Sequence, residues 1–225
     1  MLHDEDGWIT EYQRVGALWI HDDDPKRPHA LLTSGKHSNG FFNSELVIED
    51  PILLEHAVND LLGHLHSRPY FGLVSVDRVI GPAMGAITLA HEMARQIARW
   101  RSHPCLRAYT EKEVGEGEED KRMVFKKTAI RKGEVILAVD DVYTTGGSVG
   151  LMTKAVVDAG GDMLPLIVVL VNRSGKTEVD GVKIISLVNR PMPIWEPEEC
   201  PLCKVGSEAI RPKSKENWAR LNASH

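Results

Sequence analysis

The sequence predicts an α/β fold, in which helices cover both faces of a mostly parallel sheet. One indication is a set of short apolar runs of strand length, such as residues 135–139, that are bounded by polar residues. A second indication is that apolar stripes at helical spacing alternate with these runs from residue 71 onward. The 225 residues suffice for one such domain with an appendage and a substantial core.

The N-terminal part of the chain, residues 1–70, has a different pattern and is expected to form a separate helical region. It contains a helical start, a turn-rich stretch at 21–29 and a second helix that opens at Pro51. Proline suits a first helical turn because its missing N–H would have no intrahelical partner there. The buried stripe of this helix is expected to contain Ile52, Leu53, Leu54, Ala57, Val58, Leu61, Leu62 and Leu65.

Residues 71–190 are expected to form the α/β core. A strand near 73–80 leads through a Gly-Pro turn at 81–85 into a helix that ends near Arg101. After a charged excursion come the strand at 135–139, a helix that ends at Gly160 and Gly161, and strands at 164–171 and 182–188. The proline-rich tail, residues 191–225, is expected to pack on the core or on the N-terminal region.

Composition excludes several classes of protein. A net charge of -5 argues against a chain that coats nucleic acid, and a bound polyanion would need local donors and a divalent cation. No apolar stretch is long enough to span a membrane, and the acidic start MLHDEDGW is unlike a secretory signal. The three cysteines, an odd number, provide no disulfide framework, so we expect a reducing, cytoplasmic setting.

The segment after the strand at 135–139 carries the densest set of polar groups. Asp140 and Asp141 end the strand, where they can accept hydrogen bonds from sugar hydroxyls. The turn that follows contains Thr144, Thr145, Gly146, Gly147 and Ser148. Its backbone N–H groups and hydroxyls can converge on an anion, and Ser148 is expected to cap the next helix. This order predicts a site for a phosphorylated ribose; the alternative is a strand–turn–helix junction with an aspartate cap.

This segment resembles the signature of the type I phosphoribosyltransferases, which bind 5-phosphoribosyl-1-pyrophosphate (PRPP). Residues 32–43, Arg173 with its neighbours, and residues 197–206 resemble the orotate phosphoribosyltransferases, so the similarity spans roughly residues 10–210. The resemblance implies a mostly parallel sheet with a small N-terminal hood, and a homodimer. It also implies transfer of the phosphoribosyl group from PRPP to orotate in pyrimidine nucleotide biosynthesis. Mg²⁺ would be held mainly through PRPP and waters, without a dedicated set of protein ligands.

The resemblance also assigns residues to PRPP. They are Lys36, Gly81, Pro82, Ala83, Met84, Gly85, Asp140, Asp141, Thr144, Thr145, Gly146, Gly147 and Ser148. Small residues at 81–85 let backbone amides approach the pyrophosphate at a helix N-terminus, although a Gly-Pro turn alone is usually only a turn. Lys36 would neutralise phosphate charge.

The base would be bound by Phe41, Phe42, Thr144 and Arg173. Either phenylalanine would supply an apolar wall for a planar ring. Arg173 would meet the orotate carboxylate with its planar fork, which a lysine cannot reproduce. The alternatives are core aromatics behind a surface turn, and an arginine engaged in a salt bridge or a helix cap.

Residues 109–127, which are rich in acidic side chains, are interpreted as a lid that closes over PRPP and excludes water. The alternative is a solvated hairpin. Lys112 is the preferred cation for the leaving pyrophosphate and joins Asp140 and Asp141 as a catalytic residue; Arg122, Lys126 and Lys127 compete for its role.

The lid has fewer cations than those of the best-known orotate enzymes. Two rival functions therefore stay open: transfer to another base, such as a purine, and a non-catalytic PRPP-sensing paralogue.

Cys200 and Cys203 form a CxxC pair, which binds structural zinc only when further ligands join it. Cys105 is the remaining cysteine, and the ten histidines are unclustered in the sequence. Zinc therefore stays a minor alternative. His21, His29, His37 and the other histidines are expected to be unclustered, and most of the ten are expected to be solvated.

Overall fold

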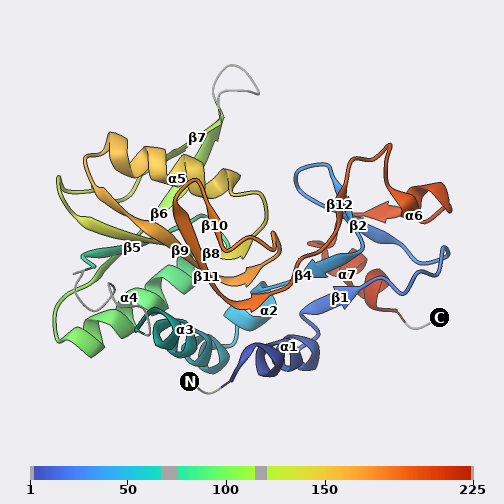
Figure 1. The fold of residues 1–225 in the computed structure, drawn as a ribbon, viewed down its shortest axis with the longest axis horizontal. Helices are drawn as coiled ribbons and strands as arrows, with labels where there is room; N and C mark the ends of the chain where they lie inside the picture. The colour runs from blue at the N-terminus through green and yellow to red at the C-terminus, as the bar shows by residue number, and fades with distance from the viewer. Residues whose placement is uncertain (1–2, 67–75, 115–120, 224–225) are drawn as a thin grey trace.

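The computed structural model describes residues 3–66, 76–114 and 121–223. In this part of the chain the central element is a seven-stranded sheet with the order β10-β11-β9-β8-β5-β6-β7 (Figure 1). The strands are β5 (Arg78–Pro82), β6 (Leu106–Val114), β7 (Lys121–Val124), β8 (Val135–Tyr143), β9 (Asp162–Asn172), β10 (Glu178–Val179) and β11 (Val182–Asn189). The inner strands are parallel and the two edge strands are antiparallel to their neighbours, which confirms the predicted sheet.

Helices cover both faces of this sheet, as predicted. They are α1 (Glu5–Arg14), α3 (Pro51–His66) and α4 (Ile87–Arg101) on one face and α5 (Gly147–Asp158) on the other (Figure 1). Successive side chains of each strand point to opposite faces of the sheet, so each strand contributes to the core on both faces. Val79 and Leu137 join the core under α3 and α4, whereas Ile80 and Ile136 join the core under α5. The sheet is therefore buried on both sides, in accord with its continuous apolar runs.

Helix α3 begins where the proline predicted it. The Asp50 carboxylate accepts hydrogen bonds from the N–H groups of Ile52 and Leu53, at 2.9 and 3.2 Å, and so caps the helix. The expectation that Ile52 is buried is wrong: its side chain is 66% exposed, and the packed stripe begins one residue later at Leu53. The expected start of the first core strand lies outside the described residues, and the described strand begins at Arg78.

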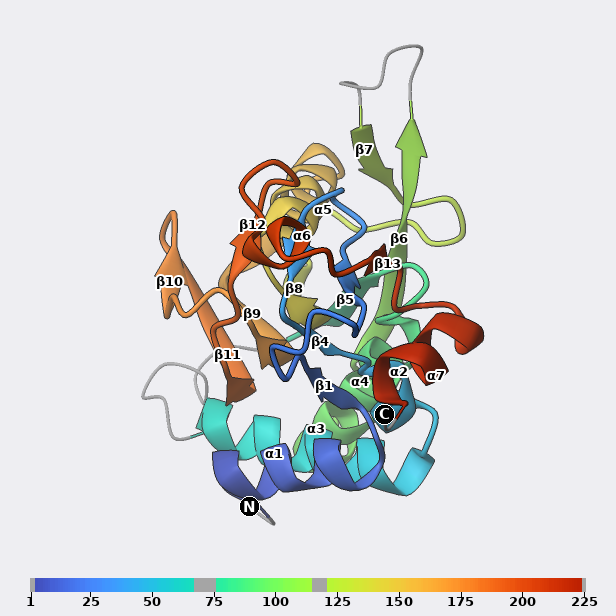
Figure 2. The ribbon, with the colours of Figure 1, turned by 90° about the vertical axis from the view of Figure 1, so that its right-hand side faces the viewer.

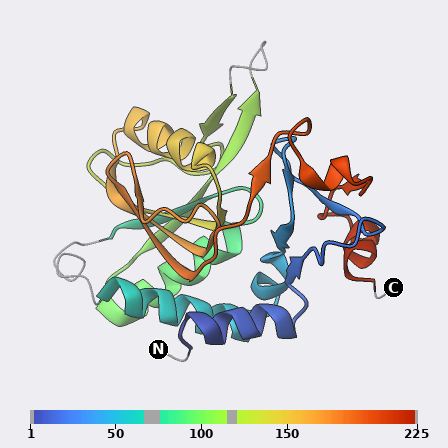
Figure 3. The ribbon, with the colours of Figure 1, turned by 45° about the vertical axis from the view of Figure 1, so that its right-hand side comes forward.

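The remaining strands form a layer beside the end of β9, which we call the hood (residues 17–42 and 191–223; Figure 3). It contains β1 (Leu18–Ile20), β2 (His29–Leu31), β3 (His37–Ser38), β4 (Gly40–Phe42), β12 (Ile194–Trp195), α6 (Pro201–Lys204), β13 (Ala209–Ile210) and α7 (Lys215–Asn222), and α2 (Glu45–Ile48) links it to α3. The two ends of the chain meet here, because β12 pairs with β3 and β13 pairs with β2. A small apolar cluster holds the hood together: Trp19, Ala30, Leu32, Phe41, Ile210 and Leu221.

Among the described residues, every helix is too short or too polar to cross a lipid bilayer.

Candidate active site

The carboxyl ends of β5 and β8 lie side by side at the point where the strand order reverses. Strand β5 pairs with β6 on one side and with β8 on the other. The chain therefore adds β6 on one side of β5 and later adds β8 on the opposite side. Open α/β sheets bind their ligands at such a switch point, beyond the carboxyl ends of the strands. The segments 81–85 and 140–148, which the sequence singled out separately, end these two strands and therefore meet.

The Gly-Pro loop at the end of β5 directly approaches the acid pair. A Cβ atom added at Gly85 would lie 3.3 Å from Asp141 Oδ2, so a larger residue would press on this carboxylate. A Cβ atom at Gly81 would lie 2.7 Å from the Ala86 Cβ, because the strand turns tightly toward α4. The Met84 side chain is 83% exposed, which leaves the loop open to a ligand.

Asp140 and Asp141 differ in their surroundings. Asp140 is 8% exposed and its Oδ1 accepts the N–H of Asp141 at 2.9 Å, whereas Asp141 is half-buried and accepts the N–H of Val142 at 2.9 Å. Burial, together with the neighbouring Asp141 carboxylate, raises the pKa of Asp140 well above its usual range. The pair therefore favours a partner that brings hydroxyl donors or positive charge.

The turn after β8 presents its polar groups to solvent. Thr145, Gly147 and Ser148 are exposed and Thr144 is half-buried, at the start of the helix α5. The first N–H groups of a helix and adjacent hydroxyls suit a phosphate. The prediction that Ser148 caps α5 is wrong: the N-cap residue is Gly146, and Ser148 lies in the first turn. Gly146 has φ +83°, a left-handed conformation that serine rarely adopts.

Arg173 follows β9 and is 3% exposed. Its backbone N–H donates to the Tyr143 carbonyl at 2.8 Å, which seats the residue beside the end of β8. Its Nη2 donates to Ser38 Oγ at 2.8 Å and to the Gly40 carbonyl at 3.1 Å, whereas its buried Nε has no hydrogen-bond partner in the described part of the chain. Burial lowers the pKa of Arg173 to about 10. A buried guanidinium with an unused donor can accommodate an acidic ligand.

The two candidate aromatic residues occupy opposite faces of β4. Phe42 packs edge-on against Tyr12 in the main core, with ring centroids 5.2 Å apart. Phe41 lies in the hood cluster near Trp218, with centroids 5.9 Å apart. Because both rings are buried among other side chains, these contacts favour the alternative of core aromatics over an open wall for the base.

The charged neighbours of two hood lysines could not be predicted from the sequence. Lys36 Nζ lies 2.6 Å from Glu196 Oε1 in a partly exposed pair, so a hood carboxylate already compensates its charge. Lys213, which sequence reasoning missed, is exposed, yet it is close enough to Asp140 to oppose the rise of that carboxyl's pKa. Its sequence gives no local signal, because only the fold of the tail brings it near the acid pair.

The predicted lid contains an antiparallel hairpin of β6 and β7, and residues 115–120 at its tip lie outside the described part. The strand β7 contains Met123, which pairs with Lys112 of β6. Arg122 pairs with Glu113, and Lys126 lies 3.9 Å from both Glu111 and Glu113. Lys112 is exposed and forms no ion pair with any described residue.

The base of the hairpin is joined to the pyrophosphate loop. The N–H of Ala83 donates to the Thr110 carbonyl at 2.8 Å, two residues before Lys112. Alternation along β6 places Lys112 on the same side of the strand as the buried Thr110, whereas Glu111 and Glu113 lie on the other side. Of the competing cations, Lys112 therefore has both a connection to the loop and a free charge.

The three histidines named from the sequence are not among the solvated ones, and the expectation that histidines are unclustered is wrong for His29 and His37. His21, His29 and His37 are 5%, 0% and 6% exposed, because the hood strands fold against the C-terminal tail. His21 Nδ1 accepts the N–H of Asp23 at 2.9 Å. His29 and His37 lie together with the CxxC cysteines, although 171 positions separate His29 from Cys200.

A parallel sheet whose switch point joins an acid pair, a small-residue loop and a Thr/Gly turn defines a type I phosphoribosyltransferase. The family of the phosphoribosyl transferase domain matches residues 48–201. The chain is 35% identical over 211 residues to the orotate phosphoribosyltransferase of Caldicellulosiruptor bescii, covering 94% of this chain and 98% of that protein. It is 36% identical over 189 residues to that of Heliobacterium modesticaldum, covering 83% and 90%. The chain therefore belongs to the phosphoribosyltransferase family, and within it to the orotate phosphoribosyltransferases.

Solved structures share the fold across enzymes for different bases. Orotate phosphoribosyltransferase from Aeropyrum pernix matches with a TM-score of 0.54 and 22% identity, over 80% of this chain and 91% of that chain. Adenine phosphoribosyltransferase from Saccharomyces cerevisiae matches with a TM-score of 0.55 and 16% identity, over 81% and 99%. These likenesses show the fold alone, and the choice of base depends on the site.

Proposed function

We propose that this chain transfers the phosphoribosyl group of PRPP to orotate, giving orotidine 5′-monophosphate and pyrophosphate, and that Arg173 recognises the base. The observation that carries the proposal is the buried Arg173 guanidinium, whose Nε has no hydrogen-bond partner among the described residues and which lies beside the strand end that bears the acid pair. An orotate carboxylate would supply the missing acceptor and the missing negative charge. A purine acceptor has no carboxylate for this position.

The residues around the switch point have separate roles in the proposed reaction. Positive charge develops on the ribose as the bond from its anomeric carbon to pyrophosphate breaks. Asp140 and Asp141 bind the ribose hydroxyls and stabilise this charge, because both carboxylates are fixed in place by backbone N–H groups. The Thr144–Ser148 turn binds the 5′-phosphate, and the loop at 81–85 binds the pyrophosphate through its backbone.

The acid pair also fits a magnesium ion. Carboxylate oxygens are the protein ligands that Mg²⁺ prefers, and the raised pKa of Asp140 indicates a site that lacks positive charge. Asp140 and Asp141 would hold the ion together with PRPP. When bound, Mg²⁺ supplies charge neutralisation at the pyrophosphate oxygens.

We further propose a cytoplasmic homodimer. The hairpin of β6 and β7 projects beyond the body of the α/β core, as Figure 2 shows, and is therefore accessible to a neighbouring subunit. The odd number of cysteines, three, gives no disulfide framework, and this supports a reducing compartment.

Substitution of Lys112 by alanine is expected to lower kcat by about tenfold or more, because one positive charge at the leaving pyrophosphate is removed. Arg122→Ala on the same hairpin is the matched control, since the charge of Arg122 is already paired with Glu113. Steady-state kinetics with PRPP and orotate would compare the two variants. Equal losses in both would mean that the hairpin contributes only its overall charge.

The function itself is tested by following pyrophosphate release from PRPP and Mg²⁺ with four bases: orotate, uracil, hypoxanthine and adenine. We expect turnover with orotate, much slower turnover with uracil, little or none with hypoxanthine and adenine, and complete loss in excess EDTA. Turnover of a purine without turnover of orotate would leave the PRPP site in place and overturn the choice of base. Tight PRPP binding with no turnover of any base would favour the non-catalytic paralogue.

A further inference from the structure

Four side chains that can bind a metal converge in the hood, outside the proposed active site. His29 lies on β2, His37 on β3, Cys200 at the N-cap of α6 and Cys203 within α6. One ligand atom from each lies within 4.8 Å of all the others. His29, His37 and Cys200 are buried, and Cys203 is the most exposed of the four.

Four of the six distances between these ligand atoms are close to the edges of a zinc-centred tetrahedron, and the other two are at most 4.8 Å. Zn–S bonds of about 2.3 Å and Zn–N bonds of about 2.05 Å at tetrahedral angles give edges of about 3.6 Å for S···N and about 3.3 Å for N···N. His29 Nε2 lies 3.5 Å from both Cys200 Sγ and Cys203 Sγ, and His37 Nδ1 lies 3.3 Å from Cys203 Sγ. The two histidine nitrogens are 3.0 Å apart.

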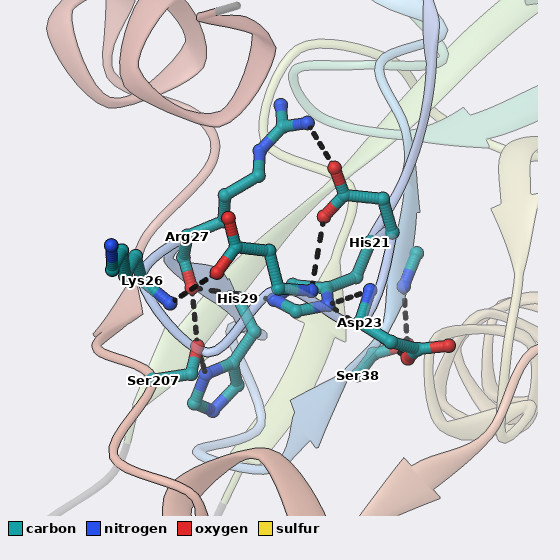
Figure 4. A network of polar contacts seen from close by, with 10 residues as sticks. His21, Asp23, Lys26, Arg27, His29, Ser38 and Ser207 are labelled. Atoms are coloured by element: carbon teal, nitrogen blue, oxygen red, sulfur yellow. Dashed lines mark hydrogen bonds and ion pairs between the residues drawn. The ribbon is translucent and has the colours of Figure 1, made fainter. Parts of the chain in front are cut away.

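A hydrogen-bond chain fixes the ring of His29 for metal binding. Ser207 Oγ donates its single proton to the Arg27 carbonyl oxygen at 2.6 Å. The same Oγ atom also lies 2.9 Å from His29 Nδ1 (Figure 4). The hydroxyl must therefore accept from Nδ1–H, so the lone pair of His29 is on Nε2 and faces the other three ligand atoms. Metal-binding histidines are typically oriented by such a partner on the second ring nitrogen.

A single cation accounts for this arrangement better than hydrogen bonds within the cluster. One imidazole lone pair accepts one good hydrogen bond, yet His29 Nε2 has three neighbours within 3.5 Å. A metal ion at the centre would satisfy all four atoms at once. Two thiolates and two imidazoles in tetrahedral positions are typical of zinc, and calcium or magnesium would prefer oxygen ligands.

We propose that His29, His37, Cys200 and Cys203 form a structural Zn²⁺ site that fastens the C-terminal tail to the N-terminal strands. Four protein ligands leave no open coordination position, so the ion has a structural role. The hood benefits from such a cross-link because its strands β2, β3, β12 and β13 have only two or three residues each. A metal that joins segments 171 positions apart in the chain restricts the unfolded state strongly.

The site also adjoins the proposed base-binding arginine. His37 is followed directly by Ser38, whose Oγ accepts a hydrogen bond from Arg173. If the proposed function holds, loss of zinc will weaken orotate binding more than PRPP binding. The metal itself is measured without any assay of activity, so the two proposals can fail separately.

The test is the metal content of the full chain, purified without an affinity tag and without chelator, measured by plasma mass spectrometry. We expect about one zinc per chain, and less than about one tenth of that in the double variant Cys200→Ser with Cys203→Ser. Cys105→Ser is the matched control and is expected to keep its zinc, because Cys105 lies outside the cluster. Chelation of the zinc is expected to lower the melting temperature by more than about 5 °C.

A cobalt titration keeps the proposal testable if the double variant fails to fold. Co²⁺ added to the chelator-stripped protein of unaltered sequence is expected to give intense visible bands of tetrahedral coordination and a thiolate charge-transfer band, and zinc should bleach both. Absence of zinc together with an octahedral cobalt spectrum would overturn the proposal. A Cys200–Cys203 disulfide in protein purified under reducing conditions, seen as a mass loss of about two hydrogens, would overturn it as well.

Discussion

Replacement of Arg173 by alanine is expected to lower kcat/KM for orotate by about 30- to 1000-fold, which corresponds to roughly 2–4 kcal/mol. The change leaves the base carboxylate without two charge-assisted hydrogen bonds in a buried site. The Kd for PRPP should barely change, because the phosphate-binding turn follows β8 whereas Arg173 follows β9. Arg173→Lys should recover only part of the loss, since a point charge cannot reproduce the planar fork.

The control for Arg173 is Arg220→Ala, which removes an exposed hood arginine that pairs with Glu208. Such a surface pair contributes little, so kinetics and melting temperature should stay close to those of the parent. Arg173 also contacts Ser38 and Gly40, and its loss could loosen the hood. Equal losses of PRPP and orotate binding would mean that Arg173 supports the fold rather than reading the base.

Asp141→Asn is expected to reduce turnover by more than about tenfold with little change in melting temperature, because the ribose loses a charged acceptor. The amide oxygen of asparagine can still accept the N–H of Val142, so the local backbone is retained. Asp158→Asn on the surface of α5 is the matched control, since Asp158 is exposed and pairs with the exposed Lys154. Unfolding of Asp141→Asn, or normal turnover, would count against the placement of the ribose.

Asp140→Asn should show a similar loss of activity but, unlike Asp141→Asn, a gain in stability. The pKa of Asp140 is raised in the folded, ligand-free protein, because burial and Asp141 disfavour its charge. The unfolded chain ionises first, near pH 4, so the carboxyl's contribution to stability is lost as pH rises through the folded-state pKa. Asparagine removes this pH dependence. The variant should melt at a higher temperature than the parent near pH 8, and the difference should shrink toward pH 4.

The sequence sufficed for the features that depend on local pattern. The apolar run before Asp140 and the glycines after Tyr143 lie within thirteen residues, 135–147, so strand, acids and turn could be read together. The parallel sheet followed from alternation of strands and helices, and parallel pairing then brought the loop of Gly85 to Asp141. The error at Ser148 was also local: either residue type can cap a helix, and only the left-handed φ of Gly146 decides between them.

Features that depend on contacts between distant parts of the chain could not be predicted from the sequence. The tail reads as proline-rich, yet it supplies β12 and β13 to a sheet with β2 and β3. This pairing buries His29 and brings it to Cys200, while neither sequence neighbourhood contains a complete set of metal ligands. The partners of Lys36 and Lys213 also come from the fold, since charged side chains at the surface follow no periodic pattern.

The most direct test of the account is the ratio of kcat/KM for orotate to kcat/KM for uracil, measured in the parent and in Arg173→Ala. Uracil has the ring of orotate without the carboxylate, so the ratio isolates the group that Arg173 is proposed to bind. We expect the parent to prefer orotate strongly and the variant to lose that preference by about 30- to 1000-fold, with the rate for uracil nearly unchanged. A ratio that is the same in both proteins would contradict the central claim that this arginine selects the base.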